Sequence, residues 1–279
     1  MTLSSKSVAV VTGAASGIGR ALAVRLAQEK IAGIAISDVN EEGLNETAAM
    51  VGALGIPVST HVFDVSNRDA VKQFADDVLA KHGRVTHLVN NAGVGLIGTF
   101  QQVTIEDFEW LMGINFWGVI YCTKAFLPTL LEQHAAHIVN VSSVFGFIAP
   151  SEQTAYVSSK FAVRGFTESL RAELSDTNVA VSVVHPGGVK TNIARNSRVG
   201  SGTPTEWKQQ GAKFFDKIAK TSPETAAEII INGIKSKNSR ILIGTDARLI
   251  SLFSRLFPKN YLRVIERIAG HKMSLRKKN

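Results

Sequence analysis

Short apolar runs rich in valine and isoleucine alternate with longer segments of helical periodicity along most of this 279-residue chain. The runs are mostly apolar throughout rather than alternately apolar and polar, which is typical of strands covered on both faces. Strands separated by helices run parallel, because each crossover helix returns the chain to the same end of the sheet. The sequence therefore predicts an α/β fold with a doubly wound parallel sheet, and ligands at the carboxyl ends of its strands.

The expected elements number about seven strands and six main helices. The strands cover residues 7–11, 33–37, 58–64, 85–90, 137–142, 179–185 and 240–244. The helices cover residues 18–29, 41–54, 68–82, 105–132, 155–175 and 224–237. Residues 188–221 are rich in glycine and polar residues and too long for a plain connector, which predicts a lid over a site.

No proline- or serine-rich linker interrupts the pattern before Gly244. We therefore expect one domain over residues 1–246, followed by a C-terminal appendage over residues 247–279. Apolar residues recur at helical spacing in this appendage, and Pro258 divides it into two short helices.

Charge is concentrated in the last 40 residues. Residues 240–279 hold 10 of the 31 lysines and arginines but only 2 of the 23 acidic residues, which accounts for the whole net charge of +8. A basic, amphipathic appendage predicts peripheral contact with an anionic membrane, or packing on another subunit or over the mouth of a site, and we favour packing. The tail lacks interleaved aromatic residues and any base-reading motif, so we expect no nucleic-acid partner.

Cys122 is the only cysteine, which excludes an intramolecular disulfide and a multi-cysteine metal site. We expect no metal. The first seven residues lack the features of a secretory signal, and no run of about 18 apolar residues occurs. These features predict a cytoplasmic protein that can associate with a membrane surface.

A glycine-rich turn, Thr12-Gly13-Ala14-Ala15-Ser16-Gly17-Ile18-Gly19, joins the first expected strand to a helix. Without side chains, the backbone can approach a pyrophosphate whose charge lies on the amino end of the helix. Asp38 ends the second expected strand, where a carboxylate can accept hydrogen bonds from the ribose hydroxyls of NAD and would repel a 2′-phosphate. Two alternatives stay open: a structural glycine turn without a ligand, and Asp38 as the cap of the next helix.

Tyr156 and Lys160 are four residues apart on an expected helix, so their side chains share one face. Tyrosine ordinarily has a pKa near ~10 and is a poor base at neutral pH. A nearby lysine ammonium stabilises the phenolate and lowers the pKa of the phenol, which suits a general acid/base.

Together these motifs identify a resemblance to the short-chain dehydrogenase/reductase family, which has a Rossmann-like fold. The resemblance covers about residues 6–245 and rests on three motifs together with Asn115, Ser143 and the pair Pro186-Gly187. The motifs are T-G-x-x-x-G-x-G at residues 12–19, Asn90-Asn91-Ala92-Gly93, and Tyr156-Val157-Ser158-Ser159-Lys160.

The resemblance implies an NAD-dependent oxidoreductase that interconverts a secondary alcohol and a ketone. It implies that Ser143 binds the substrate oxygen, Tyr156 exchanges the proton, Lys160 lowers the pKa of Tyr156 and holds the nicotinamide ribose, and Asn115 holds a relay water. The implied cofactor-binding residues are Gly13, Ser16, Gly17, Ile18, Gly19, Asp38, Asp64, Val65, Asn91, Ala92, Gly93, Tyr156, Lys160, Pro186, Gly187, Val189 and Thr191. It also implies a homodimer or homotetramer, often formed through the two long helices.

Three of these roles have structural alternatives. Ser143, rather than the neighbouring Ser142, is favoured because it stands 13 residues before Tyr156, but either serine could simply bond the backbone. Asn115 could be satisfied by a backbone carbonyl, and Thr191 could cap a lid helix.

The segments that complete the site are largely apolar, which favours a lipophilic substrate such as a steroid, retinoid or acyl derivative. They are residues 94–97 and 144–150 and a lid containing Ile193, Trp207, Phe214 and Phe215. Phe145 and Phe147 could equally belong to the core. Two other functions stay open: the same chemistry with NADP, since Arg20 lies in the turn, and a non-catalytic cofactor-sensing scaffold.

Overall fold

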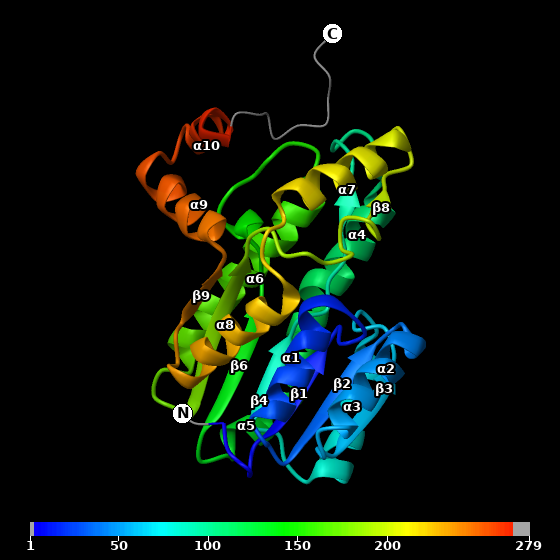
Figure 1. The fold of residues 1–279 in the computed structure, drawn as a ribbon, viewed down its shortest axis with the longest axis vertical. Coiled ribbons are helices and arrows are strands. Elements are labelled where there is room, and N and C mark those ends of the chain that lie inside the picture. The colour runs from blue at the N-terminus through cyan, green and yellow to red at the C-terminus, as the bar shows by residue number, and fades with distance from the viewer. Residues whose placement is uncertain (1–2, 270–279) are drawn as a thin grey trace.

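The computed structural model describes residues 3–269, and its main feature is one seven-stranded parallel sheet (Figure 1). The strands run in the spatial order β3-β2-β1-β4-β6-β7-β9. Their bounds are β1 Val8–Thr12, β2 Gly33–Asp38, β3 Val58–Val62, β4 His87–Asn90, β6 Ala136–Val141, β7 Val179–Pro186 and β9 Arg240–Ile243. The predicted doubly wound α/β fold is therefore confirmed, with every expected strand found within a few residues of its predicted bounds.

Helices cover both faces of the sheet, so the central strands are buried on two sides, whereas the edge strand β3 is partly exposed. Successive side chains of a strand point to opposite faces. Accordingly Val11 packs in the core beneath one group of helices and Val10 packs in the core beneath the other. The first group contains α1 Gly17–Gln28, α2 Glu41–Gly52 and α8 Pro223–Lys235, and the second contains α3 Arg68–His82, α5 Gly118–Leu131 and α6 Thr154–Glu173. This double burial explains the continuous apolar runs in the sequence.

The order of the strands reverses between β1 and β4, which lie side by side at the centre of the sheet. Connections leave these two strands in opposite directions, and such a point opens a crevice at the carboxyl ends. Thr12 joins the two ends, because its Oγ1 accepts hydrogen bonds from the N–H groups of Asn91 and Ala92, each at 3.1 Å. These two hydrogen bonds thus hold together the ends of β1 and β4 at the crevice.

The helix predicted over residues 105–132 is found over residues 105–131, but it contains a π turn that was not predicted. The structure has α4 over Ile105–Met112, one π-helical turn over Gly113–Trp117, and then α5. The side chain of Asn115 leaves the helix surface to bond the main chain of Val94, 21 residues away. Single π turns inside helices are often found at functional sites.

A second, two-stranded sheet lies above the carboxyl ends of the main sheet and was not predicted. In it β5 Leu96–Ile97 pairs in parallel with β8 Arg198–Val199, and an isolated bridge joins Gly98 to Gln153. The expected lid also contains a helix, α7 Glu206–Ile218, drawn in yellow at the top of Figure 1. The small sheet therefore ties the lid to the segments that follow β4 and β6.

The appendage forms two helices, α9 Thr245–Leu256 and α10 Tyr261–Ala269, separated at Pro258 as predicted. The boundary expected after residue 246 falls inside the first turn of α9. Figure 1 shows both helices at the edge of the molecule beyond β9. The remainder of the predicted basic tail, residues 270–279, lies outside the described residues. No helix within residues 3–269 is long and apolar enough to cross a bilayer.

Candidate active site

The glycine-rich turn between β1 and α1 is built by backbone conformations that favour glycine. Gly13 and Gly17 have φ angles of +67° and +55°, in the left-handed region. A Cβ on Gly13 would also lie 2.7 Å from the Cα of Ala92, and one on Gly19 would overlap the carbonyl of Gly13. The turn therefore depends on all three glycines, and Gly13, Ser16, Gly17 and Ile18 line a cavity that Gly19 supports from behind.

Asp38 lies at the edge of this cavity, and it does not cap α2. The cap is Asn40, whose side chain accepts a hydrogen bond from the N–H of Gly43. One carboxylate oxygen of Asp38 accepts a 2.9 Å bond from Ala15 N in the glycine turn, and the other accepts a 3.0 Å bond from Asn40 N. Backbone N–H groups thus fix the carboxylate of Asp38. The helix-cap alternative for this residue is excluded.

Arg20 does not line the cavity, and its guanidinium is bonded to other residues. Its guanidinium forms an ion pair of 2.7 Å with Glu46 and donates further bonds to the carbonyls of Ala15 and Gly43 and to the hydroxyl of Thr47. It is absent from the residues that line the cavity. A 2′-phosphate at Asp38 would therefore meet a carboxylate without the help of this arginine.

The residues that the resemblance assigns to the adenine and to the middle of the cofactor lie in the wall of the cavity. Asp64, Val65, Asn91, Ala92 and Gly93 all contribute to its lining. The carboxylate of Asp64 accepts two 2.8 Å bonds from Ser66, which fixes this turn. Asn91 donates from its amide to the carbonyls of Thr12 and Gly13, so it also braces the glycine turn.

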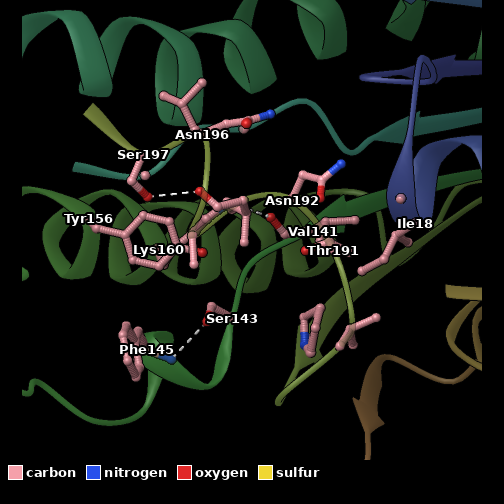
Figure 2. Close-up of a pocket in the computed structure, with 18 of the residues that line it drawn as sticks. Ile18, Val141, Ser143, Phe145, Tyr156, Lys160, Thr191, Asn192, Asn196 and Ser197 are labelled. Atoms are coloured by element: carbon pink, nitrogen blue, oxygen red, sulfur yellow. Dashed lines mark hydrogen bonds between the residues drawn. The ribbon is translucent and has the colours of Figure 1, made fainter. Parts of the chain in front are cut away.

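Ser143, Tyr156 and Lys160 line one wall of the cavity, as Figure 2 shows. Tyr156 and Lys160 come from the first two turns of α6, and Ser143 follows β6. The Nζ of Lys160 lies 5.6 Å from the centroid of the Tyr156 ring and donates a 3.1 Å bond to the carbonyl of Val141. The neighbouring Ser142 instead donates to the carbonyl of Lys160, so its role is to hold α6.

Burial controls the titration of these groups. It raises the pKa of Tyr156 to about 12, against an opposing effect of a hydrogen bond with Ser143. It also lowers the pKa of Lys160 to about 8. Burial thus outweighs the opposing effect of the Ser143 hydrogen bond and favours the protonated phenol of Tyr156. That Lys160 lowers the pKa of this phenol stays a prediction.

Asn115 does not line the cavity but fixes one of its walls. Its Oδ1 accepts a 2.8 Å bond from Val94 N, and its Nδ2 donates to Val94 O at 3.0 Å and to Ser159 Oγ at 3.2 Å. A Cβ on Gly93 would lie 3.3 Å from Asn115 Oδ1 and 3.4 Å from Lys160 Nζ. The backbone bonds that were the structural alternative for Asn115 are thus present, and they place the amide close to the lysine.

The segment from the end of β7 onward also lines the cavity and reaches the glycine turn. Pro186, Gly187, Val189 and Thr191 all line it. Thr191 caps no helix, since α7 begins at Glu206 after the N-cap Thr205. Its methyl group instead faces Gly17, where a Cβ would lie 3.1 Å away. The helix-cap alternative for Thr191 is therefore excluded.

The cavity measures about 680 Å³ and continues beyond Tyr156 into an apolar chamber. Phe145, which meets the Tyr156 ring edge-on at 5.9 Å, lines this chamber, whereas Phe147 is buried behind it against His185. Of the other expected residues, Val94, Gly95, Ile97, Val144, Pro150, Ile193, Phe214 and Phe215 line the cavity. Leu96, Gly146, Ile148, Ala149 and Trp207 do not. The volume of the whole cavity is within the range of small-molecule and cofactor sites.

These features agree with the comparison with known proteins, in which the model of the short chain dehydrogenase family matches residues 7–201. The chain belongs to the short-chain dehydrogenase family. As a member it is an NAD(P)-dependent oxidoreductase.

Two relatives and one solved structure illustrate this membership. The chain is 45% identical to the SadH protein of Mycobacterium tuberculosis over 92% of its own length and 93% of the relative. It is 31% identical to estradiol 17-beta-dehydrogenase 11 of Macaca fascicularis, over 95% of this chain and 87% of that protein. A short chain dehydrogenase/reductase from Burkholderia phymatum, solved in complex with NAD, superposes with a TM-score of 0.83 at 30% identity, covering 100% of both chains. Another similar solved structure is a complex with NADP.

The backbone of this dehydrogenase fits a dinucleotide. Both left-handed glycines of the turn face the cavity, and within the described residues α1 has no acidic residue in its first turn and no side-chain bond at its N-cap. The amino end of α1 is thus open to a negatively charged group. Asp38, Asp64 and Val65 would hold the adenosine half, and Lys160, Val189 and Thr191 the nicotinamide half.

Several cavity residues were missed by the sequence analysis. Trp110 lies on α4, Asp246 and Ile250 lie on α9, and those of the lid and loops are Ser151, Glu152, Gln153, Asn192, Asn196 and Ser197. The proline in the loop before Glu152 was the one local signal for these residues. It does not indicate that Glu152 adopts a left-handed φ of +66°, which is uncommon for this residue type. The rest depend on long-range packing.

Proposed function

We propose that this dehydrogenase uses NAD to interconvert a secondary alcohol and a ketone, with Tyr156 as the general acid/base. One observation carries the proposal. The hydroxyls of Ser143 and Tyr156 line the same cavity as Asp38 and the glycine turn. Bound nicotinamide supplies or accepts the hydride. The protein residues supply binding, orientation and the proton.

The proton step follows from the burial of the phenol. In the direction of reduction, the Ser143 hydroxyl donates a hydrogen bond to the carbonyl oxygen of the ketone. The phenol O–H of Tyr156 breaks and the substrate O–H forms. The nearby ammonium of Lys160 stabilises the resulting phenolate. Oxidation reverses this transfer, with Tyr156 as the base.

A pair of tyrosine variants tests the role of Tyr156. Tyr156→Phe removes only the hydroxyl, and we expect turnover to fall by about 10²–10⁴-fold, the usual contribution of a positioned acid/base. Tyr121→Phe is the matched control, since Tyr121 lies on α5 outside the cavity. Equal turnover by Tyr156→Phe and the parent would refute this role. If the parent itself binds NADH but turns over no alcohol in a broad panel, the non-catalytic scaffold becomes the better description.

The preference for NAD rests on Asp38 and Arg20. The carboxylate lines the cavity beside the glycine turn, and the arginine is paired with Glu46 instead. We expect kcat/KM to be higher with NAD than with NADP. Replacing the acid by Asp38→Ser should narrow the difference, because the repulsion of a 2′-phosphate is lost. A strong preference of the parent for NADP would overturn this proposal.

We also propose a lipophilic substrate, such as a steroid, retinoid or acyl derivative. The chamber beyond Tyr156 is lined by Phe145, Ile193, Phe214 and Phe215, among other apolar residues. The printed name of the relative from Macaca fascicularis, an estradiol dehydrogenase, points to the same class. A panel of secondary alcohols, followed by NADH absorbance, tests it. Turnover confined to small hydrophilic polyols would refute the proposal.

For the quaternary state, we propose a homodimer or homotetramer built on the α4 to α5 segment and on α6. Large apolar side chains are exposed there, among them Trp117 at 47% and Phe161 at 39%. Light scattering after size exclusion should give two or four chains. Phe161→Asp should dissociate the assembly, whereas an acidic residue at the distant, exposed Leu54 should not.

For the appendage, we propose packing beside the mouth of the site on one face and contact with an anionic membrane on the other. The hydroxyl of Tyr261 on α10 accepts a 3.2 Å bond from Ala149 N in the loop after Ser143. Leu252 and Leu256 on α9 are 50% and 61% exposed, close in sequence to Arg255 and Lys259.

Sedimentation with vesicles tests the membrane contact. The parent should sediment with vesicles containing phosphatidylserine and not with pure phosphatidylcholine. The double variant Leu252→Asp and Leu256→Asp should remain in the supernatant in both cases. Sedimentation of that variant with the anionic vesicles would show that these leucines are not the contact.

A further inference from the structure

Asp246 reaches from the first turn of α9 to the segment that follows β7. Its Oδ2 accepts a 2.7 Å hydrogen bond from the N–H of Gly188, 58 residues away. Bonds from an N–H to a carboxylate at this length are among the stronger hydrogen bonds in proteins. The carboxylate also lines the cavity, as do Gly187 and Gly188. One acidic side chain of the appendage therefore touches the wall that closes the cofactor cavity.

Two glycines make room for this carboxylate. A Cβ on Gly187 would overlap both carboxylate oxygens of Asp246, and a Cβ on Gly244 would overlap Oδ1. Gly244 also has a φ of +93°, which directs the chain from β9 into α9 and is rarely adopted by other residues. The three residues thus fit together as a unit, although they are spread over two separate parts of the sequence.

A simple capping role does not account for this geometry. Asp246 is an acid in the first turn of α9, where its charge suits the helix dipole. However, α9 has no side-chain capping bond within the described residues, and the carboxylate bonds Gly188 instead of its own helix. The side chain is therefore used for a contact between segments.

The position of Gly188 governs the residues that follow it. The Gly188 carbonyl accepts bonds from Lys220 N at 3.0 Å and Thr221 N at 3.2 Å, and Val189 forms a bridge with Thr221. Val189 and Thr191 come next in the chain and line the cavity. A shift of Gly188 would move both of them.

We infer that Asp246 is a positioning residue of the cofactor site, and that the appendage is an integral part of that site. Asp246 holds the Pro186 to Gly188 turn in the conformation that places Val189 and Thr191 against the nicotinamide half of the dinucleotide. This inference rests on the proposed function in that it takes NAD or NADP as the ligand of the cavity.

Three variants of the full chain test it. Asp246→Ser keeps a polar side chain that suits the start of a helix but is too short to reach Gly188. Asp246→Asn keeps an acceptor oxygen at the same position. Asp69→Ser is the matched control, because Asp69 is an exposed acid in the first turn of α3, remote from the cavity.

The first readout is the Kd of NADH and of NADPH, measured by the fluorescence of the bound dinucleotide. We expect Asp246→Ser to raise the Kd of the preferred dinucleotide about tenfold or more, Asp246→Asn to remain within about threefold of the parent, and Asp69→Ser to leave it unchanged. Parent-like affinity of Asp246→Ser would overturn the inference. So would an equal loss in Asp246→Ser and Asp246→Asn, because the acceptor oxygen would then be irrelevant.

The second readout is amide hydrogen exchange of residues 186–191 in the protein without dinucleotide. Asp246→Ser should accelerate exchange in this segment and leave residues 10–20 at the parent rate, a pattern that general destabilisation would not give. If the parent binds neither dinucleotide, the proposed function fails. The exchange experiment still decides whether Asp246 holds the turn, and unchanged exchange at residues 186–191 would refute that.

Discussion

Three buried histidines predict a loss of stability in mild acid. His87, His137 and His185 are at most 1% exposed, and burial lowers their pKa values to about 4, 3 and 4. His185 supports the active site, since its Nδ1–H must donate to the carbonyl of Ser143, which can only accept, at 2.8 Å. Its Nε2 is buried without a hydrogen-bond partner among the described residues. The folded protein therefore keeps these rings neutral.

The sign and size of the effect follow from linkage. A histidine in the unfolded chain has a pKa near ~6.5, so below that pH the unfolded state binds a proton. The folded state does not bind it, because burial lowers the pKa of the ring. Stability is thus full above pH ~6.5 and falls until the pH reaches the folded pKa. Between pH ~7.5 and ~5.0 each ring costs about 2 kcal/mol, or about 6 kcal/mol for three. A loss of that size is comparable with the whole stability of many domains.

Urea unfolding at the two pH values measures this loss, and histidine variants assign it. His185→Asn keeps a donor near the position of Nδ1, and His137→Gln keeps a polar group near Nε2, which bonds Ser182. Each variant should lose about 2 kcal/mol less than the parent over the same pH range, whatever its stability at pH ~7.5. The exposed His134→Gln should behave as the parent. If the two buried variants lose as much as the parent, the neutral buried rings are not the cause.

Three further predictions concern the glycine turn, the lid and the cysteine. Gly19→Ala should reduce NADH affinity and lower the free energy of unfolding by about 1–3 kcal/mol, because the added methyl overlaps the carbonyl of Gly13; dinucleotide titration and urea unfolding measure both. Arg198→Ala should raise KM for the lipophilic substrate more than it lowers kcat, because the guanidinium lies 3.6 Å from the Trp110 ring and anchors the lid; steady-state kinetics separate the two. Cys122, buried and with its pKa raised to about 12, should react with a thiol reagent only in denaturant.

The main sheet could be predicted because its signal is local. The central strands are covered on both faces, so the composition of a few residues indicates each of them without knowledge of the neighbouring strands. The strands β5 and β8 have two residues each, too few for any periodicity. The π turn was missed for a different reason: Asn115 bonds Val94, and only the folded chain brings these two residues together.

The candidate site shows the same difference between local signals and long-range contacts. The expected catalytic residues and the glycine turn each belong to a short sequence motif, so Ser143, Tyr156 and the turn could be named in advance. The rise in the pKa of Tyr156 could not be named, because it is caused by burial in the folded chain, which the spacing of the motif does not show.

The residues that form the wall of the proposed substrate chamber come from segments far apart in sequence, and this has a physical reason. A cavity wall over the ends of parallel strands must be built from the connections that leave them, and here the connections after β4, β6 and β7 are joined by β5, β8 and the Gly98 to Gln153 bridge. The appendage adds Ile250 to the same cavity and Asp246 to its closing turn. We therefore expect a substitution in any of these four segments to shift the other three. Substrate range should thus respond to substitutions in the appendage as readily as to those beside Tyr156.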